Sequence, residues 1–246
     1  MMQGIRASRG SRLAEGVTAV DRCVLEVGGG AWPFAKSRAD EIEAHWQEAT
    51  RVNPSYFNGI VHLVDDVSLE SGGLNASLVR TDFKSYLYWR EQGFPEAGVL
   101  DGFGSALIRS SEGHVILGRQ RAGNVNSGLV YLPSGFIDEQ DVEADGSIDI
   151  VASVVREIAE ETGAQGELLS RGPGFLVTRS GPQLSMAVPF HVAMTTEEFV
   201  RFVEGQIATH DSELEAIIPV AGLGDIEDLP MPRYARVLLE ALFATS

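Results

Sequence analysis

One stretch of the chain, residues 150 to 164, constrains both the fold and the chemistry more than any other part. At about 100° per residue, a helix through this stretch places Glu157, Glu160 and Glu161 on one narrow face. An apolar stripe lies about a third of a turn away and consists of Val151, Val154, Val155 and Ile158. The pattern therefore predicts a helix that packs one side on a core and presents three carboxylates on the other.

The three glutamates are poor choices for stability alone. Like charges at this spacing repel by a few tenths of a kcal/mol per pair in an exposed helix. A solvated acidic face is the simpler interpretation. A hard divalent cation would remove the repulsion, and oxygen ligands suit magnesium, with manganese as the alternative ion. Glu157, Glu160 and Glu161 are therefore the predicted metal ligands.

The surroundings of the helix make the pattern more specific. Arg156 precedes the glutamates, Gly163 suits the position after a helix end, and a predicted strand and glycine turn at residues 132–138 come before it. This arrangement resembles the Nudix hydrolase family, whose signature runs G, five residues, E, seven residues, R-E-U-x-E-E-x-G-U, where U is aliphatic. Residues 156–164 match the second half almost letter for letter, with Ala164 as a small final U. The resemblance implies an α+β fold, an α/β/α sandwich around a mixed sheet, and metal-dependent hydrolysis.

The first half of the signature departs from the family pattern. Gly135 and Arg156 are 21 positions apart, whereas the signature separates them by 14, so about seven residues are inserted. Counting eight back from Arg156 reaches Ile148, and six on from Gly135 reaches Asp141. The upstream glutamate of the family therefore has two candidate counterparts, Asp149 and Asp141.

Composition limits the partners. A net charge of −16 argues against a general nucleic-acid binder, and it requires metal ions and local arginines at any site for an anionic nucleotide. No run of about 18 apolar residues predicts a membrane span, and residues 1–16 lack the apolar core of a secretory signal. The single cysteine, Cys23, is expected to be a small buried residue and fits a reducing cytoplasm. The sequence also admits a homodimer.

The chain is long enough for a full domain with a smaller addition, and we expect a small α+β subdomain at 1–95 followed by the Nudix domain at 96–246. In the first part, the patterns predict one strand over 17–27, a helix capped near Ser37 that ends before Asn53, a hairpin, and a helix capped by Thr81. This part also resembles the eukaryotic Nudix branch that hydrolyses UDP-glucose and UDP-galactose. The matching residues are Trp46, Asn53, Pro54, Phe57, Asn58, Gly59, Thr81, Asp82, Phe83 and Tyr86.

Several further residues are expected at the site. Arg119 and Arg121 could hold a diphosphate or be solvated strand-end cations. Asn124, Tyr131 and Gly135 complete the predicted substrate contacts, although Tyr131 is expected mainly to pack. Arg156 is expected to point away from the carboxylates and to orient the loop or a glutamate. For the catalytic base, Glu161 competes with Glu213 and His210, and Glu160 joins the predicted catalytic set.

These patterns predict a magnesium-dependent hydrolase of a nucleoside diphosphate linked to a second moiety. A UDP-sugar is the first expectation because of the N-terminal resemblance, and ADP-ribose or a dinucleotide is the second. A nucleotide-sugar sensing module without turnover is the alternative of a different class.

Overall fold

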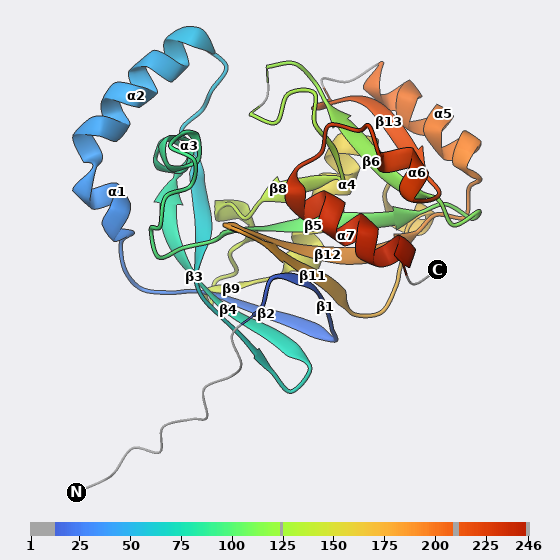
Figure 1. Cartoon of the computed structure of the whole chain (residues 1–246), viewed down its shortest axis with the longest axis horizontal. Coiled ribbons are helices and arrows are strands. Elements are labelled where there is room, and N and C mark those ends of the chain that lie inside the picture. The colour runs from blue at the N-terminus through green and yellow to red at the C-terminus, as the bar shows by residue number, and fades with distance from the viewer. Residues whose placement is uncertain (1–12, 124, 209–211, 245–246) are drawn as a thin grey trace, which may run out of the picture.

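The computed structural model describes residues 13–123, 125–208 and 212–244, which form two mixed sheets and their covering helices (Figure 1). The larger sheet has the order β1-β11-β12-β5-β6-β13, with β8 beside β5, β7 beside β6 and β10 beside β12. Its strands are β1 (Gly16–Val20), β5 (Asp101–Arg109), β6 (Val115–Gln120), β7 (Val130–Tyr131), β8 (Ser134–Phe136), β10 (Ser170–Arg171), β11 (Phe175–Ser180), β12 (Gln183–His191) and β13 (Leu214–Val220). The smaller sheet has the order β3-β4-β2-β9, with strands β2 (Arg22–Val27), β3 (Ile60–Glu70), β4 (Gly73–Asp82) and β9 (Ser147–Ile148).

Helices cover both faces of the larger sheet. The helices are α1 (Pro33–Ser37), α2 (Ala39–Val52), α3 (Phe83–Glu91), α4 (Ile150–Thr162), α5 (Thr196–Ile207), α6 (Leu223–Ile226) and α7 (Arg233–Ala244), with 3₁₀ turns at Glu139–Asp141 and Gly166–Leu168. Alternation along β5 separates the two faces, because Ala106 shares a core with Val154 of α4, whereas Leu107 packs with Leu238 of α7. In Figure 1, α7 crosses in front of β5 and β12. The expected α+β fold with an α/β/α arrangement around a mixed sheet is confirmed.

The structure corrects three local predictions in the N-terminal part. The strand expected over 17–27 breaks at Asp21, and its halves, β1 and β2, enter different sheets. Ser37 does not cap α2; its hydroxyl donates to the Phe34 carbonyl at 3.0 Å and ends α1 instead. Asp82, not Thr81, caps α3 by accepting from the backbone N–H of Ser85 at 3.1 Å. The expected hairpin forms from β3 and β4.

The two parts of the chain exchange strands across residue 95. β1 pairs antiparallel with β11 in the larger sheet, and β9, from the inserted segment, pairs with β2 in the smaller sheet. One apolar core accordingly joins Leu25 and Leu78 of the smaller sheet to Val154 of α4. A second core around Trp32 and Trp89 belongs to the N-terminal part. Deleting 1–95 would strip an edge strand from the larger sheet and uncover the shared core, so truncation is not a clean test of the N-terminal part.

Cys23 lies half-buried in β2, and burial raises the pKa of its thiol to about 12. The thiol is therefore protonated at neutral pH and behaves as the small apolar residue that the sequence predicts. In the part of the chain that the structure describes, no helix combines the length and apolar character needed to cross a bilayer.

Candidate active site

A cavity of about 520 Å³ lies where the N-terminal part meets α4 and the larger sheet. Its polar wall includes Glu157 and Glu160 of α4, together with Glu213. The N-terminal part contributes a largely aromatic wall, formed by Ser55, Tyr56, Phe57, Phe83, Tyr86 and Arg90. The volume suits a nucleotide-sized ligand. The N-terminal part therefore covers the cavity rather than lying apart from it.

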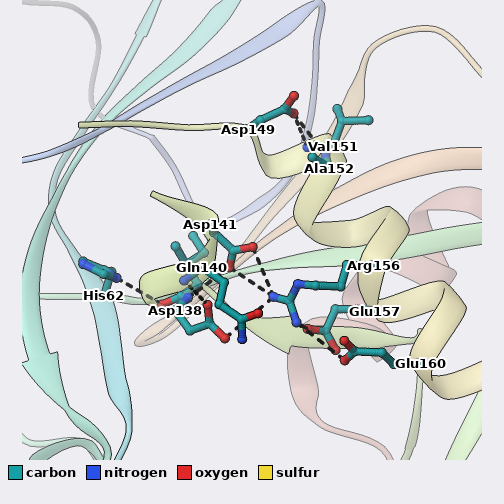
Figure 2. A network of polar contacts seen from close by, with 11 residues as sticks. His62, Asp138, Gln140, Asp141, Asp149, Val151, Ala152, Arg156, Glu157 and Glu160 are labelled. Atoms are coloured by element: carbon teal, nitrogen blue, oxygen red, sulfur yellow. Dashed lines mark hydrogen bonds and ion pairs between the residues drawn. The ribbon is translucent and has the colours of Figure 1, made fainter. Parts of the chain in front are cut away.

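Local sequence determines where α4 begins and ends. The Asp149 side chain accepts from the backbone N–H groups of Val151 at 3.0 Å and Ala152 at 3.1 Å, so it caps the helix (Figure 2). Gly163 adopts a left-handed φ of 72° and ends the helix. Between these caps, Ile150, Val154 and Ile158 are buried in the core. The predicted amphipathic helix is confirmed, with its glutamates beside the cavity.

Glu157 packs against Gly135 of β8. A Cβ at position 135 would lie 2.5 Å from Glu157 Oε2 and closer still to Cδ and Oε1. Any larger residue would thus push the carboxylate away. Burial raises the pKa of Glu157 to about 7; the charge of Arg156 opposes the shift, and the charges of Glu160 and Glu213 add to it.

Glu161 lies behind the cavity wall rather than on it. Its side chain is buried, Oε1 accepts from Gln120 at 3.3 Å, and Oε2 has no hydrogen-bond partner. Burial, followed by the charge of Glu157, raises its pKa well above the usual value, although hydrogen bonds from Gln120 and the Ser134 backbone favour the ionised form. A buried, half-paired carboxylate is costly unless a cation or a proton neutralises it.

Arg156 lies among the carboxylates, not away from them (Figure 2). Its guanidinium donates to Asp141 at 3.1 Å and lies 2.9 Å from Glu157, with Glu160 at 3.5 Å and Asp138 at 3.8 Å. The predicted orienting contacts are present, but the predicted direction of the side chain is wrong. Arg156 thus ties the acidic face of α4 to the turn at 138–141.

The inserted loop brings Asp141, not Asp149, to the acidic face. Asp141 is buried, accepts from the backbone N–H of Asp138 at 3.0 Å and contacts Arg156. Buried His62 contacts the residue before the same turn: its backbone N–H donates to the Ile137 carbonyl at 2.9 Å. Asp149 is exposed and occupied by its capping role. Of the two candidate acids, Asp141 is the one that the structure places beside Arg156 and the acidic face.

The acidic face fits a divalent cation. Within the described residues no three Asp, Glu, His or Cys side chains converge tightly enough to hold a metal in this conformation, since Glu157 turns to Arg156 and Glu161 to Gln120. The unpartnered Oε2 of Glu161 and the raised pKa values of both glutamates nevertheless indicate a shortage of positive charge. Hard carboxylate oxygens of this kind suit magnesium or manganese.

The predicted substrate contacts divide into two groups. Tyr131 and Gly135 line the cavity; Tyr131 is buried, as expected for a packing residue, and its hydroxyl accepts from Asn126 at 2.8 Å. Arg119 and Arg121 do not line it. Arg119 and Gln120 are neighbours along β6, so their side chains point to opposite faces of the sheet, and Gln120 is the one that lines the cavity. Asn124 and His210 lie outside the described residues.

Glu213 lies at the exposed rim of the cavity. Partial loss of hydration beside the wall, followed by the charge of Glu160, raises its pKa. Glu160 itself projects into solvent, with 60% of its side chain exposed. Both side chains are therefore accessible to a ligand in a way that Glu161 is not.

The cavity residues that sequence reasoning missed include Arg90, Asp101 and Gln183. Arg90 ends α3 and donates to the Val125 carbonyl at 3.0 Å and to Asn126 Oδ1 at 2.7 Å, so it links the N-terminal part to the loop after β6. Asp101 and Gln183 begin two paired strands, β5 and β12. A charged residue at the start of an otherwise apolar strand was the available signal for Asp101.

No protein-family model and no curated protein matches the chain. Solved structures do match part of it. The Nudix hydrolase RenU of M. smegmatis is 18% identical over 58% of this chain and 84% of its own, with a TM-score of 0.39. The MutT protein of Methanosarcina mazei Go1 is 21% identical over 59% of this chain and 94% of its own, with a TM-score of 0.40. The Nudix domain of Shewanella oneidensis NrtR, solved with ADP-ribose, is 16% identical over 65% and 98%, with a TM-score of 0.38.

Proposed function

We propose that the protein is a magnesium-dependent Nudix pyrophosphohydrolase that cleaves a nucleoside diphosphate linked to a second moiety. The observation that carries the proposal is the face of α4, where Glu157 and Glu160 line a nucleotide-sized cavity and Glu161 lies behind them with an unpartnered oxygen. The signature match over residues 156–164 supports the same reaction. Among diphosphates, we propose a UDP-sugar, giving UMP and a sugar 1-phosphate, because three of the N-terminal residues that resemble the UDP-sugar branch, Phe57, Phe83 and Tyr86, also border the cavity.

Each group has a distinct role in this proposal. A divalent cation held by Glu157, Glu160 and Glu161 would neutralise the diphosphate and activate water. Arg156 forms ion pairs with both Glu157 and Asp141 and so fixes the positions of these carboxylates on the acidic face. Hydrolysis adds water across a P–O bond, and the proton that the water loses needs an acceptor. Glu213 is favoured over Glu161 for that acceptor because Glu213 lines the cavity.

One observation favours a second candidate, a nucleotide-sugar sensing module without turnover. Among the residues that the structure describes, the Arg156 guanidinium contacts the carboxylates of Glu157 and Glu160, and no three Asp, Glu, His or Cys side chains are arranged to hold a metal. A guanidinium that permanently occupies the face would permit nucleotide binding without hydrolysis. Metal-dependent turnover separates this candidate from the enzyme.

The decisive experiment is product analysis by phosphorus NMR on the full chain with magnesium. The panel is UDP-glucose, UDP-galactose, ADP-ribose, NADH and coenzyme A. Glu160→Gln and Glu161→Gln remove predicted ligands, and Glu204→Gln is the matched control, since Glu204 is exposed on α5 and outside the cavity. UMP and a sugar 1-phosphate, formed by the control and lost in both site variants, support the proposal. AMP from ADP-ribose alone refutes the UDP-sugar assignment, and tight binding without turnover favours the sensing module.

A reducing cytoplasm is the compartment that we propose, because the chain has one cysteine and its thiol is half-buried. The homodimer stays a prediction, and sedimentation equilibrium of the full chain tests it.

A further inference from the structure

Asp101 is a buried acid of the cavity for which the hydrolytic reaction has no use. Its side chain is 2% exposed, and Oδ1 has no hydrogen-bond partner, although the side chain of Gln183 is close enough to favour the ionised form. An unpaired buried acceptor costs about 1–3 kcal/mol. The residue nevertheless lines the cavity. Its Oδ1 has less than 1 Å² of accessible surface in this conformation, so a ligand in the cavity reaches that oxygen only when the neighbouring Gln183 side chain moves aside.

The other oxygen of Asp101 is held in place. Tyr86 donates its hydroxyl to Oδ2 at 3.2 Å, and Arg90 donates to that hydroxyl at 3.4 Å. Arg90 is anchored in turn to the loop at 125–126. The chain of contacts fixes the orientation of the carboxylate and leaves Oδ1 as the acceptor to be filled.

The position of Asp101 suits the part of a ligand that lies beyond the diphosphate. Gly104 pairs with Gly135, against which Glu157 packs, and Asp101 lies three residues away along β5, about 10 Å at the rise of a strand. Aromatic rings surround this region: Tyr86 and Phe136 meet edge to face at 4.8 Å. Phe57 borders the same cavity and is 81% exposed, so a flat partner can still cover it.

Charge identifies what Asp101 can accept. An ionised carboxylate is only an acceptor, so its partner must carry an N–H or O–H group. A phosphate is unsuitable because two anions at contact distance repel. In a UDP-hexose or ADP-ribose the part outside the diphosphate is uncharged and consists of rings with N–H and O–H donors. Flat aromatic walls suit such rings.

We propose that Asp101 is the recognition residue of a ring subsite, in which Oδ1 accepts a hydrogen bond from a base N–H or a sugar O–H of the ligand. The side chain of Gln183, which is paired with Asp101 in the register of β12 and β5, shifts to admit the donor. The inference deepens the proposed function and rests on it for the nucleotide character of the ligand.

The test is calorimetric binding to the full chain at neutral pH with magnesium present; the probes are monophosphates without a diphosphate bond, so no diphosphate hydrolysis occurs. The probes are matched pairs with and without a donor: UMP with N3-methyl-UMP, AMP with purine riboside 5′-monophosphate, and UMP with 2′-deoxy-UMP; glucose 1-phosphate is a further probe. Asp101→Asn is the variant, because Tyr86 keeps the remaining carbonyl oxygen and the new NH₂ group then faces the ligand donor. Asp65→Asn is the control, since Asp65 is exposed on β3.

For one matched pair, the wild type and the control should bind the donor-bearing probe at least about 10-fold more tightly, as expected when one buried hydrogen bond is lost. In Asp101→Asn that ratio should fall to about one. An affinity difference between UMP and its N3-methyl derivative, or between AMP and its purine riboside partner, assigns the donor to the base. A ratio at the deoxy pair, or loss of glucose 1-phosphate binding alone, assigns it to the sugar.

The proposal is overturned if no pair shows an affinity ratio in the wild type and Asp101→Asn binds glucose 1-phosphate as tightly as the wild type does, or if an affinity ratio seen in the wild type survives in Asp101→Asn. The ratio compares two ligands on one protein, so reduced stability of the variant does not imitate the result. If the protein hydrolyses a diphosphate but no probe pair differs in affinity, the subsite is refuted and the proposed function stands. If a probe pair differs in affinity but no diphosphate is hydrolysed, the subsite stands and the proposed function is refuted.

Discussion

Gly135→Ala is the most informative single substitution in this protein. Gly135 is not in a left-handed conformation, so the backbone of β8 accepts alanine without strain. The new Cβ would lie 2.5 Å from Glu157 Oε2, whereas ordinary van der Waals contact is about 3.5 Å. The carboxylate must therefore move by about 1 Å or more. The substitution displaces one predicted metal ligand, Glu157, but leaves its carboxylate group unchanged.

The expected effects on activity and stability differ widely. A displacement of about 1 Å in a positioned group can cost about 10²-fold in rate, so kcat/KM should fall by about that factor. Glu157 ends in a flexible side chain, and an off-rotamer position costs about 1 kcal/mol. The gain from replacing glycine within a strand offsets roughly 0.5 kcal/mol of this. The free energy of unfolding should thus change by less than about 1 kcal/mol.

The assay pairs steady-state hydrolysis with urea denaturation. Gly29→Ala is the control, because Gly29 is exposed and a Cβ there would meet nothing within 4 Å. A double-mutant cycle with Glu157→Ala isolates the cause: once the Glu157 side chain is gone, Gly135→Ala should have no further effect. Unchanged activity in Gly135→Ala, or a full additional loss in the double variant, would refute the reasoning.

Three further predictions concern the same acidic face. Arg156→Met should destabilise the protein by about 3 kcal/mol in urea, because it leaves the 3%-exposed carboxylate of Asp141 unpaired; adding Asp141→Asn should recover part of the loss. In the metal-free protein, the raised pKa of Glu157 means that the folded state holds a proton which the unfolded chain has released. The free energy of unfolding should therefore fall as pH rises from about 5 to about 7, and pH-dependent calorimetry should find a shallower slope in Glu157→Gln. Asp149→Ala should cost about 1 kcal/mol without changing kcat, whereas Asp141→Asn should lower activity; the reverse would restore Asp149 as the upstream acid.

Local periodicity predicted most of the elements. The expected hairpin forms from β3 and β4, and the apolar stripe of α4 enters the core as expected. The errors came where local signals were ambiguous. Residues 17–27 have the pattern of a single strand, and only the partners in two separate sheets reveal the break at Asp21. Pairing partners are set by distant segments, which a local pattern does not contain.

The cations of the site were the least predictable residues. Arg119 lies near the end of the apolar strand β6 and Arg121 just after it, where two cations could bind a phosphate, but neither lines the cavity. Arg90, on a helix that sequence reasoning assigned to a separate subdomain, does line it. Which of several arginines enters a cavity depends on how α3 packs over β5 and β8, and that packing joins residues far apart in the chain.

By itself, the sequence determined the acidic helix, because helical spacing alone brings Glu157, Glu160 and Glu161 to one face whatever surrounds them. The spacing of apolar residues also indicated both helices and strands, while the α+β sandwich itself was an expectation from the family resemblance. Only the tertiary structure brought Asp141 rather than Asp149 to the acidic face, placed Arg156 among the carboxylates, and brought Asp101 and Arg90 to the cavity. Those contacts join strands, helices and loops that are far apart in the chain, and their geometry exists only once the two sheets have packed together.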